Sequence, residues 1–327
     1  MATKEHTTII LANLGSPTEP TAAGVREFLR QFLSDPRVVE LPRLLWMFIL
    51  YGFVLTFRPA RVAKLYQKIW TKDGSPLVAY MASLGRKLQY TLNEKYPESL
   101  TDVRVAMTYG DNNFNTILAD VARKKMERIV IVPMYPQFSA ATTGSIYDCY
   151  ADLIKKSRDI PDCRIIKDYF KEEIYLDALA SSVNEFWCQK ESRNRLLFSF
   201  HGLPQKNSDK GDPYEKQCLF TSQQVATRLN LDDNNWGIAF QSRFGPAKWL
   251  EPATDKTLES WAEAGVKDVD VICPSFSVDC LETLEEISIT NRELFINAGG
   301  KTFRYIPCLN DSQKQIEIIL ELLKKEI

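Results

Sequence analysis

Residues 103–135 read VRVAMTYGDNNFNTILADVARKKMERIVIVPMY, which is a helical pattern between two short apolar runs. The runs Val103–Tyr109 and Arg128–Tyr135 are rich in valine and isoleucine, as is typical of strands buried in a parallel sheet. The segment between them, Asn115–Met126, has its apolar residues at helical spacing. A strand, a helix and a second strand in this order predict a βαβ unit.

The same alternation of apolar runs and helical patterns continues through the rest of the chain. Six more runs have the length of buried strands: Thr8–Leu14, Arg164–Tyr169, Leu196–His201, Gly237–Ser242, Val269–Cys273 and Thr302–Pro307. Three more helical patterns lie between them: Tyr175–Trp187, Tyr214–Leu229 and Asp255–Ala264. The runs fall into two groups of four with similar spacing. We therefore predict an α/β fold of two similar lobes, each with a four-stranded parallel sheet flanked by helices, and a cleft between the lobes.

The end of the chain predicts how the lobes are divided. Ser312–Lys325 is an amphipathic helical pattern in which Ser312 has the residue type of an N-cap. We expect this helix to cross back to the first lobe. The predicted first lobe is therefore residues 1–170 with 311–327, and the predicted second lobe is residues 171–310.

Composition excludes several classes of protein. The chain has 327 residues, of which 45% are hydrophobic and 25% charged, as is usual for a folded globular protein of about two domains. It has 41 Lys and Arg against 42 Asp and Glu, and this balance argues against nucleic acid as a partner. None of the seven cysteines forms a C-x-x-C pair, and no secretory signal is evident, so we expect free thiols and a cytoplasmic location.

Common site motifs are missing, and the ends of the predicted strands carry the remaining candidates. The sequence contains no G-x-G-x-x-G after a strand, no P-loop and no G-x-S-x-G elbow, which disfavours nucleotide-binding enzymes and common hydrolases. The chain has two histidines, and only His201 lies in the interior of the sequence, at the end of an apolar strand. Because ligands of open α/β sheets bind at the carboxyl ends of strands, His201 is a candidate base or metal ligand, with a structural histidine as the alternative.

An acidic helical pattern begins at Glu282, after the strand Val269–Cys273. Glu282 and Glu286 are four residues apart, so a helix would place both carboxylates on one face. Two close carboxylates disfavour joint ionisation, so one could hold a proton near neutral pH or both could meet a divalent cation. The alternative is a solvated helix face. The aromatic residues Tyr109, Trp249 and Phe276 also follow strand ends, which suits a flat aromatic ligand.

Residues 44–57, LLWMFILYGFVLTF, break the alternation because they are apolar without any charge. At 14 residues the run is shorter than the roughly 20 needed to span a membrane. Arg58 and Arg61 follow it at helical spacing. Two interpretations stay open: a buried pair of helices, or an apolar lip at about residues 40–66 with a basic rim, which could touch a membrane surface.

The segments LANLGSP, FLSDPRVVELPRLLW, YPQFSAATTGS, SFHGLPQ, FQSRFGPAKWLEPATD and CPSFSVDCLETLEEI together resemble the ferrochelatase family. The resemblance runs from about residue 8 to about residue 310. It implies two Rossmann-like lobes of the chelatase type and an enzyme, a lyase, that inserts Fe²⁺ into protoporphyrin IX to give protoheme, the terminal step of heme biosynthesis. The alternatives are coproporphyrin III as the substrate, or a relative that binds tetrapyrroles without catalysis.

The resemblance also implies roles for individual residues. It assigns catalysis to His201 and Glu282, and metal contact to these two residues and Glu286. It assigns porphyrin contact to Leu14, Arg58, Arg61, Tyr109, Ser242, Trp249 and Phe276. Among these, Arg58 and Arg61 would hold propionates, because the guanidinium fork matches a carboxylate.

Cofactors and partners follow from the same resemblance. Fe²⁺ and protoporphyrin IX are expected as substrates, with no tightly bound cofactor. Some relatives carry a [2Fe–2S] cluster on four cysteines, but Ala140 stands at the internal ligand position and no cysteine-bearing extension follows, so we expect no cluster. The expected location is the cytoplasm, with peripheral contact of the 44–57 lip to the inner face of the membrane as the open alternative.

Overall fold

The computed structural model describes residues 6–123, 128–324 and 326, and this part of the chain contains two four-stranded parallel sheets. The first sheet has the strand order β2-β1-β3-β4, with β1 at His6–Asn13, β2 at Leu100–Met107, β3 at Arg128–Pro133 and β4 at Asp162–Ile165. The second has the order β6-β5-β7-β8, with β5 at Arg195–His201, β6 at Trp236–Gln241, β7 at Asp268–Ile272 and β8 at Thr302–Ile306. The predicted fold class is confirmed.

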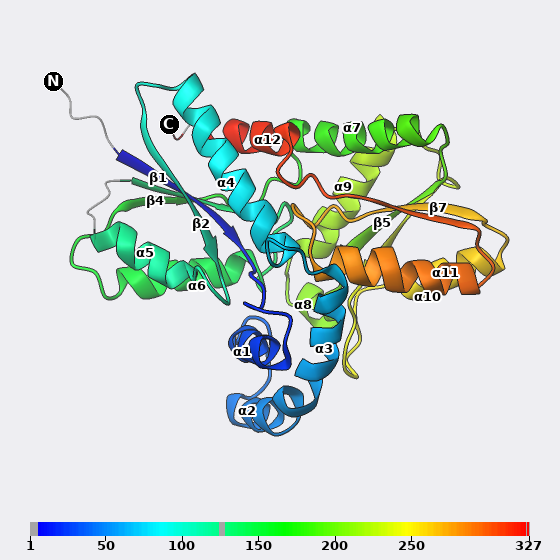
Figure 1. The fold of residues 1–327 in the computed structure, drawn as a ribbon, viewed down its shortest axis with the longest axis horizontal. Helices are drawn as coiled ribbons and strands as arrows, with labels where there is room; N and C mark the ends of the chain where they lie inside the picture. Colours follow the sequence, from blue (N-terminus) through cyan, green and yellow to red (C-terminus); the bar gives the residue numbers. More distant parts are fainter. Residues whose placement is uncertain (1–5, 124–127, 325, 327) are drawn as a thin grey trace. The chain divides into compact units, whose positions relative to one another are not determined.

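Helices lie between the strands along the chain, and α12 follows the last strand (Figure 1). In the first half they are α1 (Ala22–Phe32), α2 (Arg43–Ile49), α3 (Leu55–Ile69), α4 (Pro76–Lys95), α5 (Phe114–Arg123) and α6 (Thr143–Ile154). In the second half they are α7 (Glu173–Lys190), α8 (Gln205–Asp209), α9 (Tyr214–Arg228), α10 (Thr254–Glu263), α11 (Arg292–Asn297) and α12 (Gln313–Leu323). Two π-helices, η1 (Leu50–Val54) and η2 (Glu282–Asn291), complete the set.

The chain divides into two compact units. Unit 1 consists of Met1–Tyr135, Ser139–Asp168 and Asp311–Ile327, and unit 2 of Pro136–Phe138 and Tyr169–Asn310. The helix α12 therefore belongs to unit 1, where it packs against α4. Its predicted N-cap is confirmed, because the Ser312 Oγ accepts a hydrogen bond from the Gln315 N–H at 3.4 Å.

Two boundaries differ from the sequence prediction. The predicted strand Arg164–Tyr169 is wrong in its position: β4 is Asp162–Ile165, and the chain then leaves the sheet. The pairing with β3 runs only from Arg128 to Ile131, and Pro133 in β3 has no N–H to extend the ladder. The predicted helix Asn115–Met126 corresponds to α5, and its residues 124–126 lie outside the described part of the chain.

The lip is a continuous helical segment in unit 1, formed by α2, η1 and α3 (Figure 1). It packs on unit 1 through a few side chains, and Leu50 and Leu55 are fully buried. Six of its large apolar side chains are exposed instead: Leu44 (90%), Leu45, Phe48 (70%), Tyr51, Phe53 and Phe57 (73%). Of the two interpretations left open, the buried helix pair is therefore wrong, and the lip is an exposed apolar surface.

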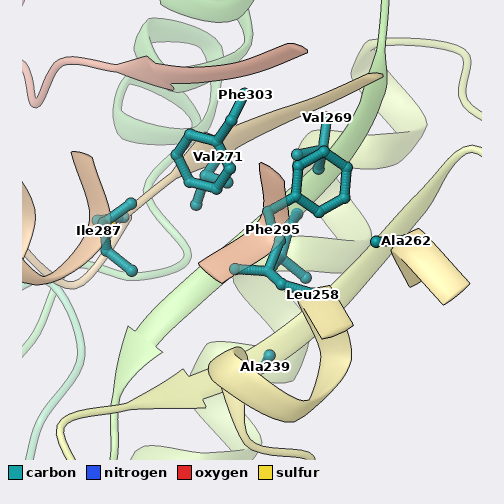
Figure 2. Packing of buried hydrophobic residues seen from close by; sticks show 10 residues of the cluster. Ala239, Leu258, Ala262, Val269, Val271, Ile287, Phe295 and Phe303 are labelled. Atoms are coloured by element: carbon teal, nitrogen blue, oxygen red, sulfur yellow. The ribbon is translucent and has the colours of Figure 1, made fainter. Parts of the chain in front are cut away.

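The core of unit 2 connects the second sheet to η2. Val269 and Val271 of β7 pack with Phe295 of α11 and Phe303 of β8, and Figure 2 shows Ile287 of η2 in the same cluster. Ile287 is fully buried. This apolar side chain anchors the acidic π-helix to the sheet, so that other positions of η2 are left to carry polar groups.

Candidate active site

His201 is the last residue of β5 and is half-buried at the carboxyl end of the strand. Its Nδ1 lies 2.7 Å from the carbonyl oxygen of Gly202. Because a carbonyl oxygen only accepts, this hydrogen bond assigns the proton of the neutral ring to Nδ1. The lone pair is then on Nε2, which is the arrangement that a base or a metal ligand requires.

The turn after His201 brings several backbone atoms into close contact. A Cβ atom on Gly202 would lie 2.6 Å from the carbonyl oxygen of Gln241 and 3.3 Å from the ring of Trp249. Only glycine fits here, because real Cβ atoms do not approach a backbone oxygen so closely. The glycine in SFHGLP therefore lets the end of β5, the end of β6 and Trp249 approach one another.

Glu282 and Glu286 lie in η2, and the secondary structure there differs from the prediction. The sequence indicated an ordinary acidic helix, but Glu282–Asn291 is a π-helix and the α-helix begins only at Arg292. A π-helix has i→i+5 hydrogen bonds and a wider turn, and such segments are frequent at functional sites. Glu282 and Glu286 still interact through their charges, as the pKa of Glu286 shows.

Glu286 combines burial with two strong hydrogen bonds. Burial raises the pKa of its carboxyl above the usual value of 4.5, and the charge of Glu282 acts in the same direction. Hydrogen bonds from Ser242 act in the opposite direction, as does the positive charge that His201 carries when its ring is protonated, but the net shift is upward. The Glu286 carboxylate therefore binds a proton more readily than the carboxylate of an exposed glutamate.

Ser242 is the residue that binds the Glu286 carboxylate. Its N–H donates to Oε1 at 2.7 Å and its hydroxyl donates to Oε2 at 2.5 Å. Both bonds depend on a left-handed backbone conformation, with φ of 65°, just after β6 ends. The sequence prediction placed Ser242 against the porphyrin, whereas in this structure its hydroxyl hydrogen is already donated to Glu286.

The predicted aromatic residues of unit 2 lie near the end of β5. The Phe276 ring is half-buried, and its centroid is 6.3 Å from that of the His201 ring. Trp249 is buried, and its Nε1 donates to the Phe244 carbonyl at 3.0 Å. The two rings are therefore held by the same loops that position His201.

In unit 1 the strand ends carry Leu14 and Tyr109. The Tyr109 N–H donates to the Leu14 carbonyl at 2.9 Å, so the two residues are neighbours after β1 and β2. Gly15, the residue after Leu14, has a φ of 103°, and a Cβ atom on it would lie 1.9 Å from the Tyr109 carbonyl oxygen. Leu14 is half-buried and Tyr109 is buried.

Tyr109 is also part of the wall of a cavity of about 890 Å³ in unit 1, together with Asp35, Thr108, Asp148 and Asp152. Its hydroxyl donates to the Asp35 carboxylate at 2.6 Å. Burial, with the charge of Asp35, holds the pKa of Tyr109 far above its usual value of 10. The phenol therefore stays protonated and acts as a hydrogen-bond donor.

Arg58 and Arg61 lie on α3, so the helical spacing assumed for them is confirmed. Arg58 is half-buried and Arg61 is exposed. The predicted site residues thus divide between the units. Unit 2 holds His201, Ser242, Trp249, Phe276, Glu282 and Glu286, and unit 1 holds Leu14, Arg58, Arg61 and Tyr109.

The sequence analysis missed two residues that contact the predicted ones. Asp35 accepts the Tyr109 hydroxyl, and the Gln241 side chain binds the backbone of Glu282 at 2.9 Å. A signal existed for Gln241, because it is a polar residue at the end of the apolar strand GIAFQ.

Across residues 6–123, 128–324 and 326, no three His, Cys, Asp or Glu side chains form a group that could hold a metal ion. The metal contacts of His201, Glu282 and Glu286 stay a prediction.

Comparison with known proteins identifies close relatives over the whole length. Residues 6–327 match the model of the family described as Ferrochelatase. The chain is 46% identical to a ferrochelatase of Acinetobacter baylyi over 324 residues, which is 99% of this chain and 95% of the relative. It is also 46% identical to a ferrochelatase of Nitrosococcus oceani, with 98% of this chain and 86% of the relative covered.

A solved structure shares the fold at low sequence identity. SirB from Bacillus subtilis with Fe³⁺ superposes with a TM-score of 0.56 and 11% identity, covering 98% of this chain and 95% of that one. At this identity the likeness concerns the fold alone. It agrees with two four-stranded parallel sheets flanked by helices.

Proposed function

The chain belongs to the ferrochelatase family, and from that premise we propose that it inserts Fe²⁺ into protoporphyrin IX to give protoheme and two protons. As a member of this family it is a metal chelatase, a lyase of heme biosynthesis, with a porphyrin and iron as substrates. The choice of protoporphyrin IX and the roles of individual residues are our proposal. The observation that carries it is the His201 ring, whose Nε2 lone pair is left available in the same unit as the protonatable Glu286.

In the proposed reaction, His201 acts first on the porphyrin. Each insertion replaces two pyrrole N–H bonds with bonds to iron, so two protons must leave the macrocycle. The His201 Nε2 is the candidate acceptor for these protons or the last protein contact of the metal. Its Nδ1 hydrogen bond to Gly202 fixes the ring in the tautomer that this role needs.

Glu286 is the proposed path for the released protons, and Glu282 is the proposed guide for the incoming cation. A carboxyl group with a raised pKa alternates between the protonated and ionised forms more easily near neutral pH than an exposed one. Glu286 can therefore take a proton released at His201 and pass it on, and Glu282 at the start of η2 can guide the incoming cation. The buried Trp249 and the half-buried Phe276 provide rigid surfaces against which the flat ring can be held in a distorted geometry.

We propose that the lip contacts the inner face of the membrane while the rest of the chain lies in the cytoplasm. In the described residues one helix, Arg43–Ile69, is long and apolar enough to cross a membrane by length and composition. The 14-residue run alone had not indicated this. Leu50 and Leu55 are buried within unit 1, whereas Leu44, Phe48 and Phe57 are exposed, and a helix held on one side by protein suits an interfacial position better than a span.

Flotation with anionic vesicles tests the lip. The variant Phe48→Ser/Phe57→Ser should lose most of its vesicle binding, and Tyr90→Ser, an exposed aromatic on α4, is the matched control. Equal flotation of all three proteins would show that the lip does not bind the membrane. Flotation that persists after an alkaline wash would indicate a spanning helix instead.

The porphyrin specificity is tested by anaerobic incubation with Fe²⁺ and either protoporphyrin IX or coproporphyrin III, followed by the Soret absorbance. We expect a kcat/KM for protoporphyrin IX that is at least about tenfold higher, which corresponds to about 1.4 kcal/mol. A preference for coproporphyrin III would overturn the proposed substrate and leave the family assignment intact.

A further inference from the structure

We propose that Gln241 is a positioning residue of this active site, because its buried amide holds the first residue of η2 in place relative to His201. The inference rests on the proposed roles of His201 and Glu282. It concerns a residue that makes none of the proposed contacts with iron or porphyrin.

The side chain of Gln241 connects three elements of unit 2. Its Nε2 donates to the carbonyl oxygen of Glu282 at 2.9 Å, and its Oε1 accepts from the Ser199 hydroxyl of β5 at 2.7 Å. The Cys273 thiol, just after β7, lies 3.6 Å from the same Oε1. Gln241 is only 2% exposed, so these groups have no water to replace a lost bond.

An amide is the group that this position requires. The Glu282 carbonyl needs a donor and the Ser199 hydroxyl needs an acceptor, and a carboxamide supplies both from one planar group. An ionised carboxylate has no donor for the carbonyl, and an apolar side chain has neither function. The Ser199 hydroxyl also lies 2.8 Å from the Thr254 hydroxyl at the start of α10, and this contact helps orient Ser199 toward the amide.

The backbone of Gln241 binds the other half of the site. In the sheet, Gln241 pairs directly with His201, and its carbonyl accepts from the Gly202 N–H at 2.8 Å. The next residue, Ser242, holds the Glu286 carboxylate. The end of β6 therefore links the histidine to both glutamates, and the Gln241 side chain is the link to Glu282.

The hydrogen bond from Gln241 to Glu282 matters because Glu282 is the first residue of a π-helix. A π-helix is rare because its hydrogen bonding is less favourable than that of an α-helix, so it depends on contacts from outside. Glu282 has such a contact on its carbonyl oxygen from β6, outside the π-helix, whereas the Glu286 carbonyl is bound by the last residue of η2 itself. Gln241 donates to Glu282, and the Asn291 side-chain amide donates to Glu286 at 2.8 Å.

Loss of the Gln241 amide should therefore displace Glu282 without removing any ligand contact. Because a shift of about 1 Å in a catalytic group can cost up to about 100-fold in rate, the effect belongs in kcat. We expect Gln241→Met, which keeps the volume, to lower kcat by about 10- to 100-fold while the KM for the porphyrin changes less than about twofold.

The matched control is Gln217→Met. Gln217 is another buried glutamine of unit 2, on α9, and its Oε1 accepts from the Phe138 N–H at 2.6 Å. Both variants are assayed below the onset of thermal unfolding. A Gln241→Met enzyme with kcat within about twofold of wild type, or with a loss matched by Gln217→Met, would overturn the inference.

A double-mutant cycle separates positioning from general stability. If Ser199 acts through Gln241, Ser199→Ala lowers kcat in the wild-type background and has no further effect in Gln241→Met. Independent, multiplying losses would contradict the proposed network. His201→Ala is measured alongside, because full activity of that variant would refute the proposed function, whereas an inactive His201→Ala with a normal Gln241→Met would refute only the positioning role.

Discussion

His201 and Glu286 differ in what the surrounding atoms do to them. The His201 ring is oriented by one hydrogen bond to the Gly202 carbonyl, which leaves Nε2 without a proton. Glu286 is half-buried and receives two hydrogen bonds from Ser242, yet its pKa remains above the usual value because desolvation outweighs them. At the scale of single residues, unit 2 therefore carries an imidazole with an available lone pair on Nε2 and a carboxyl group whose pKa is raised.

We predict that His201→Ala abolishes metal insertion while porphyrin binding persists. The hydrogen bond from His201 Nδ1 to the Gly202 carbonyl leaves the Nε2 lone pair of this candidate base available, and removing a general base typically costs about 10²–10⁴-fold in rate. Insertion is measured by the Soret absorbance and porphyrin binding by fluorescence quenching. The other histidine, His6 in β1, gives the control variant His6→Ala. Near-normal turnover of His201→Ala would refute the assignment.

At the scale of elements, two helices of unit 1 have defined tasks. The helix α3 carries the basic residues that follow the exposed apolar surface of the lip. The helix α12 is attached to α4 at its start, where the Asp311 carboxylate accepts from the Ser83 hydroxyl at 2.5 Å and the Lys87 Nζ at 2.6 Å. The basic residues of α3 suit ligand binding. The contacts of Asp311 attach α12, from the end of the chain, to unit 1.

We predict that Arg58→Ala raises the porphyrin KM by roughly ten- to a hundredfold. A charge-assisted hydrogen bond to a propionate at a half-buried site contributes about 1.5–3 kcal/mol, at about 1.4 kcal/mol per tenfold. Arg61 is exposed, so Arg61→Ala should have a smaller effect. The propionates are remote from the ring nitrogens, so kcat should change less than KM.

The dimethyl ester of protoporphyrin serves as the test substrate for these arginines, because it lacks the propionate charge. Both variants should lose affinity for the free acid and keep it for the ester, and Lys64→Ala, an exposed cation of the same helix, should match wild type with either substrate. An unchanged KM for the free acid would exclude a propionate site. Equal losses with acid and ester would indicate lost packing.

We predict that Asp311→Asn lowers the melting temperature at neutral pH and that the difference disappears in acid. Burial acts to raise the pKa of Asp311, but hydrogen bonds from Lys87 and Ser83 outweigh it, so the net pKa lies below the usual 3.8. A depressed pKa contributes stability above 3.8 that is lost as the pH falls through the folded-state value. Because Lys87 is half-exposed, we expect a loss of at most about 1 kcal/mol. A melting difference that persists unchanged below the folded-state pKa would contradict this account.

At the scale of the whole molecule, the chain has two units with similar sheets and separate sets of predicted residues.

In the described part of the chain, the cysteines are spread over both units: Cys149, Cys163, Cys188, Cys218, Cys273, Cys280 and Cys308. Burial raises the pKa of the Cys149 thiol to about 11 and that of Cys163 to about 12. Such thiols are poor sources of the thiolates that iron–sulfur clusters need.

We therefore predict that the purified protein has no [2Fe–2S] cluster. The expected visible spectrum of the anaerobically purified protein is free of cluster absorbance, and iron and acid-labile sulfide should both be well below stoichiometric amounts. The Cys188→Ala variant serves as a further check, since Cys188 is exposed and its removal should change neither the spectrum nor the activity. A reproducible cluster spectrum with matching iron and sulfide would refute the prediction.

Local apolar patterns were enough to predict the alternation of strands and helices, because buried parallel strands and amphipathic helices each have a characteristic spacing of apolar residues. All eight predicted apolar runs overlap a strand, and the run that was misplaced, at Arg164–Tyr169, belongs to the edge strand β4 with its short pairing. The family, and with it the candidate residues, also followed from motifs in the sequence.

How those residues are held depends on contacts that form only in the folded chain. The Ser242 bonds to Glu286 and the Gln241 bond to Glu282 join residues about 40 positions apart, and no local pattern encodes such contacts. The π-helical form of Glu282–Asn291 was likewise not evident from the local pattern, which indicated an ordinary helix. The same holds for the lip, because an apolar run does not reveal whether another element will cover it. Exposure of Phe48 and burial of Leu50 depend on what packs against each side, which is decided by the rest of unit 1.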